Sequence, residues 1–151
     1  MGTTKLVLPK GHQDLDITPA MEQEMMDVQR ELDLKGNQLA EGKIHFIITK
    51  GFYKHDKKLL TLASVIVNKT EHDIKGLDMN LKIALRERPE AQFSTMTVNL
   101  DDEFLGLIQS NEAFILHINI PANNVSNKDE IYEPTDLTGE IENLNYYMPQ
   151  S

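Results

Sequence analysis

The sequence predicts a mainly β fold: an antiparallel immunoglobulin-like β-sandwich preceded by one amphipathic N-terminal helix. One stretch before residue 36 has helical periodicity, and after residue 42 the period of the apolar residues changes from 3.6 to 2. The later strands never alternate with helices, which disfavours a parallel sheet. Polar connections of hairpin scale favour antiparallel pairing instead. An α+β fold, with an antiparallel sheet and the helix on one face, is the alternative.

The chain has 151 residues, which is enough for one domain with a hydrophobic core. Residues 1–16 mix turn residues with charges, and we expect them to form a flexible N-terminal arm. Residues 17–151 are expected to form a single domain, with the helix at about 18–35 and the β-sandwich at about 42–148.

The predicted helix carries signals at both ends. Thr18 is a good N-cap, and Pro19 suits the first helical position because its missing N–H is not needed there. Gly36 is expected to end the helix in the left-handed conformation. One apolar stripe recurs between these ends at helical spacing: Met21, Met25, Val28 and Leu32.

Two strands joined by a polar turn are predicted next. Residues 44–53 place Ile44, Phe46 and Ile48 on one face of the first strand. Residues 59–68 are nearly all apolar and β-branched toward their end. This composition is typical of a strand that is covered on both faces.

The next strand, at residues 77–85, alternates cleanly between apolar and polar side chains. Its apolar residues point inward, and Asp78, Asn80 and Lys82 point outward. Such a strand has one face in water, so we expect one sheet to be partly open to solvent. The residues before it, Asn68–Asp73, are interpreted as a turn between two core strands.

Three further strands are predicted at residues 91–100, 113–121 and 140–148. The last segment is also compatible with a short helix. A strand is favoured because Leu144, Tyr146 and Met148 alternate, and adjacent tyrosines suit a pleated surface.

Composition excludes several classes of function. The net charge of −9 and the pI near 4.9 disfavour binding to nucleic acid or to an anionic membrane surface. The absence of cysteine removes disulfides, thiolate catalysis and cysteine zinc sites. No apolar stretch is long enough for membrane insertion or for a secretory signal, so the chain as written is expected to be cytoplasmic. It would be envelope-associated if a leader had been removed.

No catalytic residue, cofactor or metal site is predicted, and no small-molecule substrate is identifiable. The five histidines never occur at metal-ligand spacing, and no serine lies in a nucleophile motif. The acidic run Asp101, Asp102 and Glu103 could hold a hard cation, but it lacks the calcium-loop pattern. We interpret it as a solvated acidic turn.

Two groups of residues are candidates for partner binding. Met21, Met25 and Met26 give the helix an adaptable surface, of the kind that promiscuous binding faces use. Met21 and Met25 also fit the domain's own core, so Met26 is the better candidate for an exposed contact. The second group is the open strand face: Asp78, Asn80 and Lys82.

Three segments share a family-like pattern of apolar strands and polar turns: LLTLASVIVNKTEHDIKGLDMNLKI, AQFSTMTV and LGLIQSNEAFILHINIP. Over about residues 20–121 this pattern resembles the SLAP domains, small domains named after S-layer assembly proteins of Firmicutes. The resemblance implies a non-enzymatic role near protein export or cell-envelope assembly in a Gram-positive bacterium. It transfers no catalytic residues.

Three classes of function remain open. A non-enzymatic module that binds a protein partner or assists assembly is favoured, because no catalytic constellation is visible. The alternative is a structural subunit or a homo-oligomer that uses strand edges, such as a phage or envelope component. An enzyme whose site is assembled only in three dimensions comes third. A binding module should expose an apolar patch on the helix or on an edge strand.

Overall fold

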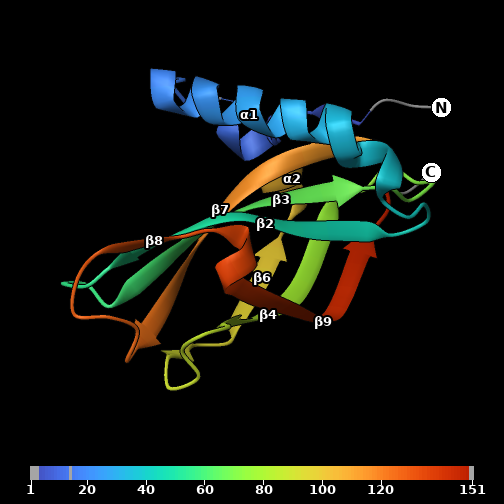
Figure 1. Ribbon diagram of the computed structural model, residues 1–151. Coiled ribbons are helices and arrows are strands. Elements are labelled where there is room, and N and C mark those ends of the chain that lie inside the picture. The colour runs from blue at the N-terminus through green and yellow to red at the C-terminus, as the bar shows by residue number, and fades with distance from the viewer. Residues whose placement is uncertain (1–3, 14, 150–151) are drawn as a thin grey trace.

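The computed structural model in Figure 1 describes residues 4–13 and 15–149 of the chain. Among the described residues, strands hold 47% and helical segments 20%, which confirms a mainly β fold with one main helix. The elements are β1 (Lys5–Leu6), η1 (Lys10–His12), α1 (Pro19–Lys35), η2 (Gly36–Gln38), β2 (Ile44–Lys54), β3 (Leu59–Asn68), β4 (Gly76–Leu85), β5 (Gln92–Phe93), β6 (Met96–Leu100), α2 (Asp102–Leu105), β7 (Glu112–Asn123), β8 (Glu130–Tyr132), η3 (Pro134–Asp136) and β9 (Leu137–Tyr147).

The strands form two sheets that face each other. The larger sheet has the order β1-β7-β3-β2-β8, and β5 adds to β7 outside this path. Its strands are antiparallel except for β1, which runs parallel to β7. The smaller sheet has the antiparallel order β6-β4-β9. In Figure 1, α1 lies across the outer face of the larger sheet, and the smaller sheet lies against its other face.

The helix α1 begins where the sequence predicts. Thr18 is the N-cap, and its hydroxyl oxygen accepts a hydrogen bond from the N–H of Met21 at 3.1 Å. The helix ends at Lys35, as predicted, but the left-handed conformation predicted for Gly36 is wrong, because this residue is right-handed, with φ of −57°, and leads directly into η2. Glycine is needed at position 36 because a side chain would not fit there. A Cβ atom on Gly36 would lie 2.9 Å from the hydroxyl oxygen of Thr4.

The strand β3 belongs to two hydrophobic cores at once. Toward the smaller sheet, its Leu62 and Ile66 join the main core, where they are fully buried. Toward the helix, Val65 and Val67 pack in a second cluster with Leu32 of α1. The prediction that this run is covered on both faces is confirmed, because a helix covers one face and a sheet the other.

The alternation predicted for β4 is confirmed. Its apolar residues are at most 8% exposed and face the main core: Leu77, Met79, Leu81, Ile83 and Leu85. Asp78, Asn80 and Lys82 lie on the opposite face, where Lys82 is exposed and the other two are half-buried. The smaller sheet therefore keeps one face in water.

The segment at residues 140–148 is a strand, within β9, up to Tyr147. Its alternation does not mark a buried face, because Leu144 and Tyr146 are each 37% exposed. The pairing of β9 with β4 shifts register at Asp78/Asn80. One extra residue in β9 forms a β-bulge there, where Asn143 has a positive φ of 55°.

The N-terminal segment, expected as an arm over residues 1–16, packs on the domain over part of its described length. Thr4 and Pro9 are buried, and β1 pairs with β7. Gln29 of α1 holds the segment from the other side: its side chain accepts from the N–H of Leu6 at 2.8 Å and donates to the Thr4 carbonyl at 3.1 Å.

The turn after β3 is built by a buried asparagine, as the turn interpretation expects. Asn68 is 1% exposed, and its side-chain amide donates to the carbonyls of His72 at 2.9 Å and Ile108 at 3.2 Å. Its side-chain oxygen accepts from the N–H of Thr70 at 3.0 Å and from the Thr70 hydroxyl at 2.5 Å. The turn is therefore part of the folded core.

Candidate partner-binding surfaces

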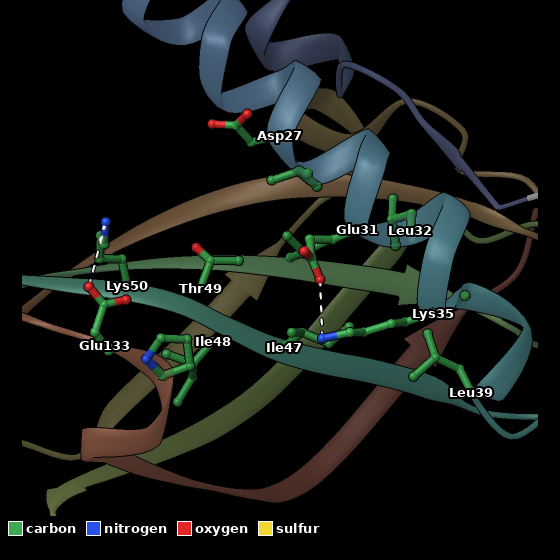
Figure 2. A pocket seen from close by; sticks show the side chains of 14 residues that line it. Asp27, Glu31, Leu32, Lys35, Leu39, Ile47, Ile48, Thr49, Lys50 and Glu133 are labelled. Carbon is green, nitrogen blue, oxygen red and sulfur yellow. Dashed lines mark ion pairs between the residues drawn. The ribbon is translucent and has the colours of Figure 1, made fainter.

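A groove of about 490 Å³ separates α1 from β2 on the outer face of the larger sheet. Figure 2 shows the helix along one side of this space and the strand along the other. The lining is mainly apolar: Val28 and Leu32 come from the helix, Ile47 and Val65 from the sheet, and Leu39 from the segment after the helix. Such a surface suits apolar side chains better than a charged ligand.

The groove exists because α1 packs over β3 and β7 and leaves β2 partly uncovered. Val28 and Leu32 of the helix form one cluster with Val65 of β3 and Ala113 of β7. Ile47 of β2 lies on the same face of the sheet, but it is only half-buried. This second hydrophobic cluster is therefore open to solvent along β2.

Two ion pairs lie at the rim of the groove, one on each side (Figure 2). On the helix, Lys35 Nζ lies 3.3 Å from Glu31 Oε2. On the sheet side, Lys50 Nζ lies 3.8 Å from Glu133 Oε1. All four side chains are at least 43% exposed. Exposed pairs contribute about 0–1 kcal/mol, so these side chains can rearrange around a partner at little cost.

A smaller cavity, of about 160 Å³, lies between the N-terminal segment, the first half of α1 and β7. Met21 and Met25 line it and are half-buried, whereas Met26 is 53% exposed. At its wall His117 Nε2 lies 3.0 Å from Glu24 Oε2. Met21 and Met25 therefore face the domain itself, and Met26 alone of the three points to solvent.

The outer face of the smaller sheet is polar and cross-linked between strands. Tyr147 of β9 donates its hydroxyl hydrogen to Asp78 Oδ2 at 2.5 Å. Thr97 of β6 donates to Asn80 Oδ1 at 3.0 Å. The third outward residue of β4 is Lys82, whose Nζ lies 2.6 Å from Glu142 Oε1. Each of the three predicted residues on β4 thus has a partner on a neighbouring strand.

Two of these contacts shift the pKa of a participating group. The hydrogen bond to Asp78, and then the charge of that carboxylate, raise the pKa of Tyr147. The Glu142 carboxylate raises the pKa of Lys82 in the same way, first by hydrogen bonding and then by charge. Both shifts favour the protonated donor.

The six residues predicted from sequence do not form one surface. The methionines lie on α1, which packs on the outer face of the larger sheet (Figure 1). Asp78, Asn80 and Lys82 lie on the outer face of the smaller sheet, with both sheets between them and the helix. A single partner segment could not contact both groups.

The groove was not predicted from the sequence, although a signal for it is present. The predicted inward face of β2 contains Ile44, Phe46 and Ile48, and no role was predicted for Ile47. Ile47 and Ile48 are adjacent, so β2 has an apolar residue on each face. One of them joins the main core and the other the cluster under α1.

Other shifted pKa values have local causes at three different cavities. Burial lowers the pKa of His12, and the charge of His117 adds to the effect. A hydrogen bond from the backbone N–H of His55 lowers the pKa of Asp129. Burial raises the pKa of Tyr132 to about 12. His12, Asp129 and Tyr132 each line a separate cavity, so the three shifts do not combine in one site.

The acidic run at residues 101–103 has a structural role at the start of α2. Asp101 is the N-cap of this short helix, and its Oδ1 accepts from the N–H of Phe104 at 3.0 Å. Across residues 4–13 and 15–149, no three His, Asp or Glu side chains come together in a group that could hold a metal ion.

Comparisons with protein-family models, with curated proteins and with solved structures find no match to this chain. In the part of the chain that the structure describes, no helix combines the length and apolar character that crossing a membrane requires.

Proposed function

We propose that this protein is a non-enzymatic protein-binding or assembly module, which docks an apolar segment of a partner protein in the groove between α1 and β2. The observation that carries the proposal is the position of Ile47. It continues the cluster under the helix, yet it stays half-buried at the floor of an open groove.

The energetics of the groove support docking. Complete burial of one aliphatic side chain contributes about 1.5–3 kcal/mol. Two partner side chains on the half-buried Ile47 and Leu39 would therefore supply a useful share of a binding free energy, before the cost of association. The exposed ion pairs at the rim would adjust to the partner, as rim residues of interfaces do.

We also propose that the two sheets have an immunoglobulin-like arrangement. Three strands of the larger sheet, β2, β3 and β7, take the positions of strands A, B and E of that fold. The smaller sheet, β6-β4-β9, then follows the order C′, C and F. Folds of this kind serve many unrelated functions, so the fold supports the scaffold and not the activity.

The resemblance to SLAP domains supports a role near protein export or cell-envelope assembly in a Gram-positive bacterium. The resembling segments include β3, β4 and β7, the strands of the two cores. The groove is formed by α1 and β2, which lie next to these strands. The groove would present its bound partner to the other components of an assembly.

Site-specific photo-crosslinking in the native host tests the groove directly. In one variant, a photoreactive phenylalanine analogue replaces Leu39 in the groove. In the matched control variant, it replaces Leu34 near the end of α1. Leu34 is 67% exposed and lies outside the groove lining. We expect a discrete cross-linked protein from position 39 and none from position 34.

Substitution of the groove floor completes this test. Ile47→Lys should abolish the cross-link, because a buried charge replaces an apolar contact. Ile131→Lys, at a 63% exposed position of the same sheet outside the groove, should leave it intact. The proposal fails if both positions give the same product, if neither does, or if a folded Ile47→Lys protein still cross-links.

A further inference from the structure

The free edge of β9 is the longest stretch of sheet edge among the described residues. The strands β1, β8 and β6, which end the other sides of the sheets, have only 2, 3 and 5 residues. The outer edge of β7 is bridged at its two ends by β1 and β5. β9 has 11 residues, and its one strand neighbour within residues 4–13 and 15–149 is β4. Its other edge offers backbone N–H and C=O groups to another strand.

The core is also less well covered on the side of this edge. The inner side chains of β2, Ile44, Phe46 and Ile48, remain half-buried, whereas Leu62 and Ile66 on neighbouring β3 are at most 1% exposed. β2 has no strand partner beyond Gly51–Tyr53 on its side toward β8 in the described structure. The open edges of β2 and β9 therefore belong to one side of the molecule.

β9 is in reach of this uncovered surface. A Cβ atom on Gly139 would lie 3.0 Å from Ile48 Cδ1, so the last strand of the smaller sheet touches the inner face of β2. An additional strand next to β9 would lie over the half-buried side chains of β2. Exposed apolar residues continue this surface along the C-terminal half of β9, Leu144 and Tyr146, and just after the strand, Met148.

The negative charge of β9 indicates which charge its partner strand should have. Glu140 and Glu142 are its two charged residues, and the strand contains no Lys or Arg. Glu142 is paired with Lys82, while Glu140 is exposed. Opposite charges on neighbouring strands stabilise a sheet, and like charges destabilise it. A strand from a second copy of β9 would add two more glutamates, in a protein whose net charge is already −9.

We propose that the free edge of β9 accepts one extended strand from a separate, basic partner protein. The partner strand pairs with the backbone of β9. Its alternate apolar residues cover Ile44, Phe46 and Ile48, and a Lys or Arg lies beside Glu140. This interaction uses strand addition, a recognised mode of peptide binding. It is independent of the groove under α1.

The test uses a short capped peptide in which valine and lysine alternate, with affinity measured by calorimetry on the intact protein. The matched control peptide alternates valine with glutamate. Two further peptides carry N-methyl groups on one or the other alternate set of residues, which removes donors from only one edge of the peptide. Because a strand uses one edge to pair, one N-methylated peptide should bind about tenfold more weakly and the other about as well as the parent.

Charge reversal on the protein gives a second readout. Glu140→Lys should weaken the valine–lysine peptide and improve the valine–glutamate peptide, with Glu103→Lys on α2 as the control that changes net charge equally. Equal affinity of both N-methylated peptides would overturn the proposal, since attraction between charges alone would explain binding. So would absence of binding, or dimerisation of the free protein through β9, which would make a second copy the occupant.

Discussion

The strands β3 and β9 have similar lengths, 10 and 11 residues, but opposite environments. β3 lies inside the larger sheet, between α1 and the smaller sheet, and is buried from Leu62 to Asn68. β9 ends the smaller sheet, and only Leu137 is buried along its whole length. Position in the fold, rather than strand length, therefore decides which strand stabilises the domain. β9 is left free to interact with other molecules.

The largest expected effect comes from truncating one apolar residue in each strand. Ile66→Ala should lower the free energy of unfolding by about 2–5 kcal/mol, because Ile66 is 1% exposed in the main core. Leu144→Ala in β9 should change it by no more than about 0.5 kcal/mol. Urea denaturation measures both. Similar losses in the two variants would show that β9 contributes to the core as β3 does.

Truncating an asparagine should also destabilise the protein more at the end of β3, where Asn68 lies, than in β9, where Asn145 lies. Asn68→Ala removes a fully buried side chain that donates to the carbonyls of His72 and Ile108, and it leaves the backbone N–H of Thr70 without its acceptor. We expect a loss of about 1–3 kcal/mol in the free energy of unfolding. Asn145→Ala in β9, whose side chain makes an exposed hydrogen bond to Asn143, should be nearly neutral. Equal effects in denaturation experiments would contradict a structural role for the buried turn.

Alkaline pH should destabilise the protein through a buried tyrosine. Burial raises the pKa of Tyr132 from its usual value of 10 to about 12, so between these values the unfolded state loses a proton that the folded state keeps. The contribution of Tyr132 to stability is therefore fully present below pH 10 and is lost as the pH rises toward 12. Tyr132→Phe should flatten this decline in a series of denaturation curves. If the stability of Tyr132→Phe falls just as steeply with pH, other groups cause the decline.

The smallest effect concerns a tyrosine on the exposed face of β9. The hydrogen bond to Asp78 and the charge of that carboxylate raise the pKa of Tyr147, so Asp78→Asn, which removes the charge, should bring that pKa back toward its usual value. NMR titration of labelled tyrosine rings resolves this residue from the others. Asn80→Asp, on the same strand face, is a control that adds a charge without removing the hydrogen bond. A Tyr147 pKa that does not fall in Asp78→Asn would show that the pair does not persist in solution.

Local signals predicted most of the regular elements. The cap at Thr18, the apolar run of β3 and the alternation of β4 each determine structure within a few residues. The two-residue strands β1 and β5 are too short to show a period, so their pairing with β7 follows from tertiary contacts alone. The need for glycine at position 36 also depends on a distant residue, because Thr4 of the N-terminal segment occupies the space that a Cβ atom would take.

The candidate surfaces were less predictable than the fold. A single strand pattern places Asp78 on an exposed face, but it cannot tell which strand lies beside it. The groove requires the position of α1 over β3 and β7, and only the adjacent pair Ile47 and Ile48 hints at it in the sequence. The free edge of β9 depends on the order of strands in the sheet, which no local pattern encodes.

We expect a basic partner strand to bind at the free edge of β9, which ends the smaller sheet. Amide hydrogen exchange with and without the valine–lysine peptide tests it most directly, because each strand reports separately. We predict slower exchange in β9 and an unchanged rate in β6, at the opposite edge of the same sheet. Slower exchange in β6 instead, or in neither strand, would contradict the claim.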